Sequence, residues 1–540
     1  MTDPRADAAG GPAPEHVTTD VVVVGGGVAG LVAALECARI GLAVTVLEQA
    51  ERPGGSVGRI ELDGLVLDSG AESFATRGGS VAGLLEHLGL ADRVVSPNPA
   101  GAWLVWGERG ARGGSAGDLS AAPLPRTGVL GIPANPLGDD VRAIIGWRGA
   151  WRAYADRIMP ILKIGRVHRL GPLVRQRMGS AVLERLVTPI SAGVYSTDPD
   201  DLDLDVVAPG LNEAMTRAGS LSGGVAQLVE ARRAGGAVQG IDGGMHRLVD
   251  ALLAELDRFG VVVRTGMRAT GLERRGEPGT SEAADAAGGA ETDGAGAGWH
   301  VTATPAVAGA AASDGDPALD APAAADAPRD LVLDAPYALL ATPAHVSLAL
   351  LDGLLPERVD VAEWPAAASV ELVTLVVDAP ALDAAPRGTG VLVAAGTPGV
   401  TAKALTHSSA KWSWLADAAA GRHVVRLSYG RAGAANPLEG LDDEHVVELA
   451  VADASRLLGV PLARSHVRAA GRSAWRDALS QAAVGQRDRV RGLEELVAAE
   501  PGLELAGSWV AGTGLASVVP QAVEAAARIR HLAVRPRDDA

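Results

Sequence analysis

Cysteine is nearly absent from this chain, because Cys37 is the only one among 540 residues. A single cysteine excludes an intrachain disulfide and a cysteine-rich metal site, and its simplest role is that of a small buried apolar side chain. The sequence also lacks a metal-ligand cluster, a nucleophile elbow and paired carboxylates at a recognisable spacing. We therefore predict no metal site and identify no catalytic side chain, so a bound cofactor has to supply any reaction chemistry.

Long apolar runs and excess positive charge are missing as well. No stretch reaches the roughly 18 uninterrupted apolar residues of a membrane-spanning helix, and residues 1–17 have neither the basic nor the apolar region of a signal peptide. We therefore expect a cytoplasmic protein. The formal net charge of -17 argues against nucleic acid as a general partner. Hydrophobic residues still make up 47% of the chain, which allows a large core and several domains.

Three glycines near the N-terminus have the spacing of a dinucleotide-binding turn. Valines from Val21 onward lead into Gly25, Gly27 and Gly30, and an Ala/Leu-rich helical segment and a second apolar run then end at Glu48. In such a βαβ unit the first glycine allows a tight turn, the second lets a pyrophosphate approach the backbone, and the third lets helix and strand pack closely. A carboxylate at the position of Glu48 holds both ribose hydroxyls, so an unphosphorylated ribose is expected.

The residues after Glu48 narrow the cofactor further. Arg52, Gly54 and Gly55 complete the extension ExxxRxGG, which resembles that of flavoproteins related to amine oxidases and porphyrinogen oxidases. This resemblance implies one non-covalent FAD rather than NAD. The cofactor contacts that it implies are Gly25, Gly27, Val28, Ala29, Gly30, Glu48, Gln49, Arg52, Gly54, Gly55, Gly70, Ala71, Glu72, Ser73, Val263, Trp475, Gly512 and Val519.

A second glycine-to-helix corner lies near the C-terminus. A strand and the glycines Gly507, Gly512 and Gly514 lead into an Ala-rich helix that begins near Ser517. The N-terminus of such a helix can direct its dipole at a flavin ring or its diphosphate. We therefore expect both ends of the chain to build one flavin site.

Several longer stretches resemble the FAD-dependent, oxygen-dependent protoporphyrinogen/coproporphyrinogen oxidases within the flavin amine oxidase superfamily. They are LPRTGVLGIP at 124–133, RQRMGSAVLERLVTPISAGVYSTDPDDLDL at 175–204, GTGVLVAAG at 388–396, HSSAKW at 407–412 and GSWVAGTGLASVV at 507–519. The second stretch matches the family at Gly179, Arg185, Leu186, Val187, Pro189, Gly193, Val194 and Tyr195. The chain departs from the family pattern within 480–486, at Ala394, and at Ala516 and Ser517, which replace a proline and an acid.

This resemblance implies an enzyme of haem biosynthesis that oxidises a porphyrinogen to the porphyrin, with dioxygen as acceptor and hydrogen peroxide as product. The Ala-, Gly- and Arg-rich composition looks like that of bacterial lineages that use coproporphyrin, so coproporphyrinogen III is expected over protoporphyrinogen IX. By position, Leu392 and Thr389 would hold the macrocycle and Arg77 would meet a propionate, with Arg175 and Arg177 as weaker candidates for the same work. A core residue and a surface cation are the simpler interpretations of Leu392 and Arg77.

The predicted fold class is α/β (α+β overall), with a Rossmann-like FAD-binding domain, a mixed-sheet substrate-binding domain and a helical subdomain. Low-complexity composition between the strands of the first domain indicates a surface insertion. The expected boundaries are a disordered tail at 1–17, a discontinuous FAD-binding domain at 18–76, 236–355 and 478–536 with the insertion at 275–330, a substrate-binding domain at 77–120, 221–235 and 356–477, and a helical subdomain at 121–220.

The segment 141–178 combines an apolar stripe with many basic residues. A spacing of three and four places the apolar members on one helix face, namely Ile144, Trp147, Trp151, Tyr154, Ile158 and Ile161. A face turned to the core, with a solvated basic face opposite, is one interpretation. The other is a docking surface within 142–177 for anionic lipid, for a carboxylated ligand, or for a ferrochelatase-type acceptor of the product.

Two further functions remain open. Another flavin oxidoreductase of the amine oxidase or carotenoid desaturase type would share the N-terminal signature, and Trp475 and Trp509 are the aromatic residues available for an amine oxidase cage. The altered C-terminal motif also fits a non-catalytic FAD-binding partner in the haem pathway.

Overall fold

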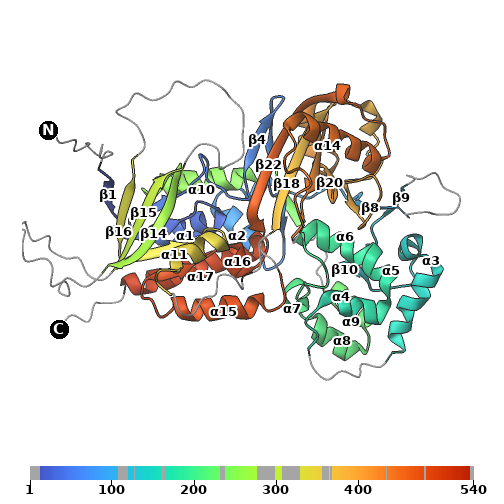
Figure 1. Cartoon of the computed structure of the whole chain (residues 1–540), viewed down its shortest axis with the longest axis horizontal. Helices are drawn as coiled ribbons and strands as arrows, with labels where there is room; N and C mark the ends of the chain where they lie inside the picture. The colour runs from blue at the N-terminus through green and yellow to red at the C-terminus, as the bar shows by residue number, and fades with distance from the viewer. Residues whose placement is uncertain are drawn as a thin grey trace, which may run out of the picture.

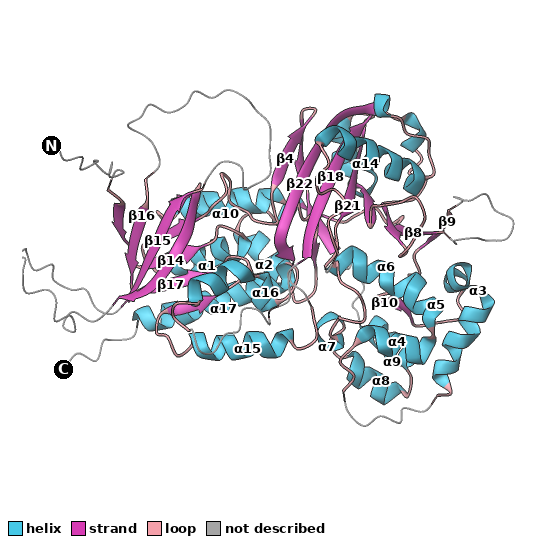
Figure 2. Ribbon diagram, in the orientation of Figure 1, coloured by secondary structure: helices cyan, strands magenta, loops and turns pink. Residues whose placement is uncertain are grey.

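The computed structural model describes residues 13–107, 119–126, 128–159, 166–231, 238–275, 298–306, 329–355, 364, 368–432, 434–479 and 482–534. One half of the molecule, on the left of Figure 1, contains a parallel sheet with helices beside it. The other half holds a large mixed sheet at the top and a group of short helices below it, as the colouring of Figure 2 makes clear. The first and last parts of the chain therefore meet in the same half.

All strands of the five-stranded sheet are parallel, in the order β13-β3-β2-β17-β23. Val21 and Val23 of β2 face one hydrophobic cluster and Val22 and Val24 face another, which explains a strand of four valines. The strands are β2 (Val21–Val24), β3 (Val44–Leu47), β13 (Val262–Arg264), β17 (Tyr337–Leu340) and β23 (Leu503–Leu505).

Helices cover one face of this sheet, and a second sheet covers the other. Helices α1 (Val28–Ala38), α10 (His246–Arg258) and α17 (Leu515–Val534) share the cluster of Val21 and Val23. The opposite cluster contains a four-stranded sheet, in the order β1-β16-β15-β14, and two helices. These elements are β1 (Glu15–Thr18), β14 (Met267–Arg275), β15 (Gly298–Pro305), β16 (Leu331–Ala335), α11 (Ala344–Leu351) and α15 (Gln486–Val497).

The structure shows strands in both the predicted tail and the predicted insertion. Residues 15–17 were expected in a disordered tail, but they belong to β1, which pairs in parallel with β16, so this expectation is wrong at that end. Val17 of β1 packs against the hydrophobic core beside this sheet, which explains why β1 pairs with β16. Within the predicted insertion, the expected strand near Trp299 is confirmed as β15. The remaining parts of that insertion, 276–297 and 307–328, lie outside the described residues.

The second half is organised around a seven-stranded mixed sheet, in the order β22-β18-β21-β20-β19-β8-β9. Only β19 and β8 pair in parallel; the other described neighbours are antiparallel. Helix α14 (Asp443–Leu458) packs on one face of the sheet. The strands are β8 (Ala102–Trp106), β9 (Ser120–Pro123), β18 (Ala368–Val377), β19 (Gly390–Val393), β20 (Ala404–His407), β21 (His423–Tyr429) and β22 (Val467–Leu479).

The group of short helices, here called the helical group, has a hydrophobic cluster of its own and lies beneath the sheet in Figure 1. Two of its segments, η3 and η4, are π-helical, and η4 carries Gly193 and Tyr195 of the family motif. The elements are α3 (Asp139–Tyr154), α4 (Leu170–Met178), α5 (Ser180–Val182), η3 (Leu183–Val187), α6 (Thr188–Ile190), η4 (Ser191–Tyr195), α7 (Leu204–Val207), α8 (Leu211–Ala218) and α9 (Leu221–Ala231).

The prediction of one buried apolar face along α3 is wrong. Ile144 is 1% exposed, but Trp147 and Trp151 are 58% and 57% exposed, and Ile158, which follows the end of α3, is 81% exposed. The cause is a kink at Gly146, whose φ of 67° and ψ of 173° interrupt the helix. Because glycine adopts a positive φ without steric penalty, the helix changes direction there and residues on either side no longer share a face. The last member of the predicted stripe, Ile161, lies outside the described residues.

Short elements connect the two halves. The predicted hairpin after the glycine signature is present as β4 (Arg59–Leu62) and β5 (Leu65–Asp68). The other short elements of the described chain are β6 (Phe74–Ala75), α2 (Ser80–His87), β7 (Val94–Val95), β10 (Gly128–Val129), β11 (Ile132–Pro133), β12 (Val238–Ile241), α12 (Ser408–Lys411), α13 (Ser413–Ala419) and α16 (Ser508–Ala511). Of these, β10 and β11 pack in the cluster of the helical group. The α/β fold class is confirmed, whereas the exact domain boundaries stay a prediction.

Candidate flavin and substrate site

The N-terminal glycine turn between β2 and α1 has the geometry expected of a dinucleotide-binding corner. Gly25 has a φ of +107°, and a Cβ there would lie 2.8 Å from the carbonyl oxygen of Ala341. A Cβ on Gly30 would lie 1.9 Å from the carbonyl oxygen of Gly25, so α1 packs directly on the turn. A Cβ on Gly27 would meet only the Cα of Gly55, at 4.0 Å. The protein therefore leaves space beside Gly27, at the end of α1 where phosphates bind.

Glu48 connects the end of β3 to this turn. Its Oε2 accepts a hydrogen bond from the Gly26 N–H at 2.8 Å, and its Oε1 accepts one from the Ala50 N–H at 2.8 Å. Burial raises the pKa of Glu48, although these backbone donors act in the opposite direction. The carboxylate is thus oriented by the backbone, and each oxygen keeps a second lone pair for a ribose hydroxyl.

The second pair of glycines, Gly54 and Gly55, lies against the first turn. The Gly54 N–H donates to the Gly26 carbonyl at 2.8 Å, and Gly27 and Gly54 form an isolated parallel bridge. Gly54 has a φ of +128°, and a Cβ there would lie 2.6 Å from the Val57 carbonyl. The close approach of two glycine-rich backbones explains why this extension contains two glycines.

The loop at residues 68–73 runs from the hairpin to β6 and is held by the large sheet. Arg426 of β21 donates to the carbonyl of Gly70 at 2.7 Å, and Trp475 of β22 donates to the carbonyl of Ser69 at 3.1 Å. Gly70 has no room for a side chain, because a Cβ would lie 2.1 Å from the Ser56 carbonyl. These contacts fix the loop at the junction of the two halves.

The carboxylate of Glu72 belongs to the same junction. Ser408 Oγ donates to Glu72 Oε1 at 2.6 Å, and Arg426 and Lys411 lie 3.4 and 3.5 Å from its two oxygens. Burial alone would raise the pKa of Glu72, but the charges of Arg426 and Lys411 hold it below its ordinary value. The side chain of Glu72 therefore ties the loop to the large sheet.

Helices α1 and α17 run in the same direction. Glu36 near the end of α1 pairs with Arg530 near the end of α17, at 2.9 Å. Their N-termini consequently lie at the same edge, where Gly512 and Gly514, both with a φ of +96°, turn the chain into α17. Val519 is 3% exposed and packs in the cluster of α1, so its side chain faces the core.

Arg77 lies where three parts of the structure meet. Its Nη2 donates to Ser517 Oγ in the first turn of α17 at 2.9 Å. Burial raises the pKa of Tyr195 in the helical group, and the nearby positive charge of Arg77 partly offsets this effect. An exposed arginine between α17 and the helical group is well placed to meet an anionic group.

Leu392 lies at the seam between the large sheet and the helical group. A Cβ on Gly193 would lie 2.6 Å from Leu392 Cδ2, so the two residues are in contact. Leu392 and Tyr195 both pack at the edge of the same cluster. Thr389 precedes β19, where its carbonyl accepts a hydrogen bond from the His407 N–H at 3.0 Å. Leu392 thus combines core packing with a position at the seam.

The other two predicted substrate ligands have acidic partners. Arg177 is buried, and its Nε donates to Asp156 Oδ1 at 2.6 Å. Arg175 lies 3.1 Å from Asp200 at the surface. Both ion pairs are internal to the helical group. A substrate contact of Arg175 or Arg177 stays a prediction.

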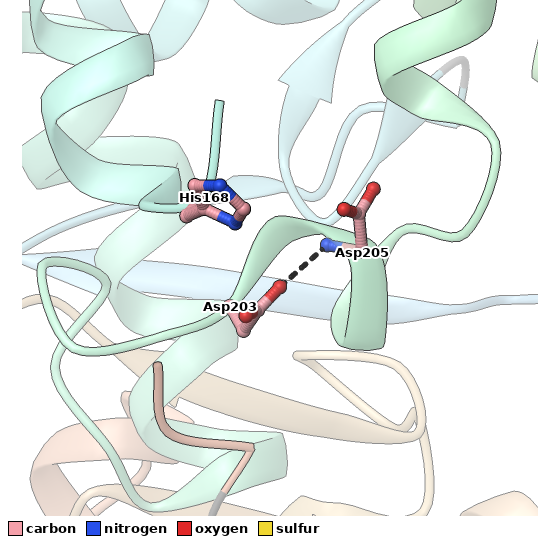
Figure 3. A group of neighbouring side chains, drawn as sticks. All are labelled: His168, Asp203 and Asp205. Atoms are coloured by element: carbon pink, nitrogen blue, oxygen red, sulfur yellow. Dashed lines mark hydrogen bonds between the residues drawn. The ribbon is translucent and has the colours of Figure 1, made fainter. Parts of the chain in front are cut away.

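The structure also brings together a group that could coordinate a metal. Ligand atoms of His168, Asp203 and Asp205 lie within 4.8 Å of one another (Figure 3). Asp203 already caps α7 by accepting from the Asp205 N–H at 2.9 Å, and Asp205 accepts from Asn212 Nδ2 at 2.9 Å. Because these carboxylates serve local hydrogen bonds, we assign no metal to them.

Sequence reasoning missed a buried lysine beside the seam. Lys403 is 2% exposed, and its Nζ donates to Ser196 Oγ at 2.5 Å. Burial, together with the charge of Arg431, lowers the pKa of Lys403 to about 7. A lysine inside the run VTAKALTH, at 400–407, is the signal that could have identified it.

The turn, its acidic residue and the two glycine corners together have the arrangement of a nucleotide-binding oxidoreductase. The family model for flavin containing amine oxidoreductase matches residues 28–294 and 329–529, and the chain belongs to this family.

Two mycobacterial relatives align with nearly the whole chain. Coproporphyrinogen III oxidase of Mycobacterium tuberculosis is 29% identical over 511 residues, which cover 94% of this chain and 95% of that protein. The protein of the same name from Mycobacterium leprae is 30% identical over 518 residues, covering 94% and 96%. A solved structure from Exiguobacterium sp. 255-15 is provisionally named a protoporphyrinogen oxidase. It matches this chain with a TM-score of 0.71 at 24% identity, and the match covers 97% of this chain and all of that one. The match in fold therefore extends over nearly the whole chain.

Within the described part of the chain, no helix combines the length and the apolar character needed to cross a membrane.

Proposed function

We propose that this protein is an FAD-dependent oxidase that converts coproporphyrinogen III, in preference to protoporphyrinogen IX, to the corresponding porphyrin in haem biosynthesis. Dioxygen is the acceptor and hydrogen peroxide the product. The observation that carries the proposal is the likeness to coproporphyrinogen III oxidases over more than nine tenths of the chain. The open space at Gly27 supports the cofactor assignment, because a protein that did not bind a dinucleotide would have no need to keep it.

The residues present fit an FAD. Gly27 and the N-terminus of α1 would take the pyrophosphate, Glu48 the adenosine ribose, and the backbone at Gly70 and Gly512 the flavin end. When bound, the flavin supplies the acceptor for a hydride from the substrate and passes the electrons to dioxygen. The protein orients both molecules, and Arg426 and Trp475 hold the loop at Gly70 against the large sheet.

A porphyrinogen is flat and apolar in its body and anionic at its carboxylates, so it needs aliphatic contacts and cations. Leu392 and Thr389 would supply contacts to the body, and Arg77 would bind a propionate. Two observations support this arrangement: Leu392 contacts Gly193 of the helical group, and the charge of Arg77 acts on the pKa of Tyr195 in that group.

An amine oxidase remains the alternative, but its aromatic cage finds little support in the described residues. Trp509 donates to the Thr342 carbonyl and stacks edge-to-face on Trp364 within the core. Trp475 donates to Ser69. Both indoles are held by protein groups rather than presented as a pair.

The purified protein tests the proposal directly. We expect a yellow protein that converts coproporphyrinogen III to a fluorescent porphyrin, with oxygen uptake and hydrogen peroxide in equal amounts. Protoporphyrinogen IX should give a lower kcat/KM. A yellow protein that consumes no oxygen with either porphyrinogen would refute the oxidase and leave the non-catalytic FAD-binding partner.

We also propose that α3 contacts a membrane carrying anionic lipid. Trp147, Trp151 and Ile158 are exposed, and the guanidinium of Arg142 lies 4.1 Å from the centre of the Trp147 ring. Exposed tryptophans next to arginines match the interfacial region of a bilayer. Docking of a ferrochelatase-type acceptor at the same helix, and the cytoplasmic location, stay predictions.

A further inference from the structure

A buried cation lies at the end of the large sheet that faces the helical group. The N–H of Lys403 donates to Ser428 of β21 at 2.9 Å, and its carbonyl accepts from Val393 of β19 at 3.2 Å. Its Nζ has three donors, of which Ser196 Oγ takes one. No described carboxylate forms an ion pair with it, although a buried ammonium group is costly without a counter-charge.

Arg431 brings a second positive charge to this place. It follows Gly430, whose φ of +81° ends β21, and it is half-buried. Burial lowers the pKa of Arg431, and its charge acts on Lys403. Within the described residues Arg431 has no hydrogen-bonded acid. Two desolvated cations that repel each other would both be stabilised by one anion between them.

Ser196 holds this cluster next to the proposed substrate contacts. It has a φ of 55°, a left-handed conformation that is uncommon outside glycine and that recurs at binding sites. Its carbonyl accepts from the Ala432 N–H at 2.8 Å, so both its backbone and its hydroxyl face the end of the sheet. The preceding residue, Tyr195, lies near enough to Arg77 for that charge to act on the Tyr195 pKa, and Gly193 contacts Leu392.

We propose that Lys403, Arg431 and Ser196 form a carboxylate-binding site for the substrate, a second anchor beside Arg77. The inference rests on the proposed function and deepens it. A porphyrinogen that reaches from Arg77 past Leu392 would place a second propionate at this cluster. An additional anchor favours the four carboxylates of coproporphyrinogen III over the two of protoporphyrinogen IX, because each unpaired cation costs binding free energy.

The test compares flavin-loaded wild type with Lys403→Met, Arg431→Gln and Arg431→Lys. Arg468→Gln, an exposed cation on the edge strand β22, is the control for simple loss of charge. We expect Lys403→Met and Arg431→Gln to raise the Kd of coproporphyrin III and the KM of its porphyrinogen about tenfold or more, with kcat and flavin absorbance unchanged. The effect on protoporphyrinogen IX should be smaller. Arg431→Lys, which keeps the charge, should retain most of the affinity.

Unchanged coproporphyrin Kd in both Lys403→Met and Arg431→Gln would overturn the inference and leave a structural lysine–serine pair. If Lys403→Met does not fold, the test relies on the half-buried Arg431. Arg431→Gln should then bind coproporphyrin III more weakly than Arg431→Lys, and equal Kd values in these two variants and wild type would overturn the inference. If wild type oxidises porphyrinogens and these variants have the same Kd and KM, only this inference is refuted. If wild type neither binds nor oxidises porphyrinogens, the proposed function is refuted as well.

Discussion

Glu48 Oε2 accepts a hydrogen bond from the backbone N–H of Gly26 at 2.8 Å. This contact fixes the carboxylate at the end of β3 against the glycine turn that begins α1. The proposed ribose ligand and the proposed pyrophosphate site are therefore held in one arrangement by the protein itself. Gly54 donates to the carbonyl of the same residue, Gly26. The backbone of one residue, Gly26, thus links three segments of the proposed cofactor site.

Two glycines of the turn should respond differently to substitution. Gly27 has a φ of -68° and a ψ of 172°, which any residue adopts, and a Cβ there would be 4.0 Å from the nearest atom. Gly27→Val should therefore fold but lose flavin, since each lost charged hydrogen bond to the pyrophosphate costs roughly 1.5 to 3 kcal/mol. The flavin absorbance of the purified protein and the melting curve of the flavin-free protein check this.

Gly30→Ala is the matched comparison, because its Cβ would lie 1.9 Å from the Gly25 carbonyl and should destabilise the fold itself. A yellow Gly27→Val protein would contradict the placement of the pyrophosphate. Equal destabilisation of both variants would contradict the distinction between an open and a packed glycine.

Substitutions at Arg77 and Ser517 distinguish the contribution of the Arg77 charge from that of the hydrogen bond that holds Arg77 to α17. Arg77→Gln removes the proposed propionate ligand and should raise the KM for coproporphyrinogen III about tenfold, by the value of a charged hydrogen bond. Ser517→Ala removes only the hydrogen bond of 2.9 Å that holds Arg77 to α17. Because this pair is exposed, Ser517→Ala should change KM by less than about threefold. Steady-state kinetics at fixed flavin loading distinguish the two, and an unchanged KM in Arg77→Gln would remove Arg77 from the substrate site.

The N-terminal corner could be predicted from sequence because every part of it is local. Gly25, Gly27, Gly30 and Glu48 follow one another within a βαβ unit, where spacing alone determines which residue turns, packs or binds. The same holds for the second pair of glycines, Gly54 and Gly55, whose contact with Gly27 follows from the requirement of close backbone approach.

Sequence spacing could not predict contacts between segments that are far apart in the chain. The burial of Arg177 depends on Asp156, and that of Lys403 on Ser196, more than 200 residues earlier in the chain. The exposure of Trp147 depends on a single backbone angle at Gly146, which no hydrophobic periodicity records. Periodicity describes a continuous helix, so it fails where glycine interrupts one.

Lys403 should make the stability of the flavin-free protein depend on pH. Its pKa is about 7 in the folded protein and 10.5 ordinarily, so the unfolded chain binds the proton more tightly. The free energy of unfolding is therefore highest above about pH 10.5. It falls as the pH decreases from about 10.5 to about 7, and this effect of Lys403 is constant below about pH 7. Lys403→Met lacks this dependence and should be more stable than wild type at pH 7, by a few kcal/mol at most, with a smaller difference at pH 10. Urea unfolding at both values tests this, and parallel pH curves would contradict a buried, titrating lysine.

The exposed side chains of α3 should govern binding to anionic vesicles. Replacing Trp147 and Trp151 with Ser removes two aromatic side chains that are more than half exposed, so the fold should be little affected. Arg148→Glu reverses an exposed charge on the same helix. In flotation with vesicles of phosphatidylcholine and phosphatidylglycerol, we expect wild type to bind at low salt, Arg148→Glu to bind less, and the double Ser variant to bind least.

Flavin content and turnover in solution should stay unchanged in all of them, because the helix is separate from the proposed cofactor contacts. The control is Phe259→Ser, which removes an exposed aromatic residue beside α10, in the other half of the molecule. Phe259→Ser should leave vesicle binding at the wild-type value. If wild type fails to float with anionic vesicles at any salt concentration, α3 is not a lipid-binding surface. If Phe259→Ser lowers binding as strongly as the double variant, the effect comes from general surface hydrophobicity and not from this helix.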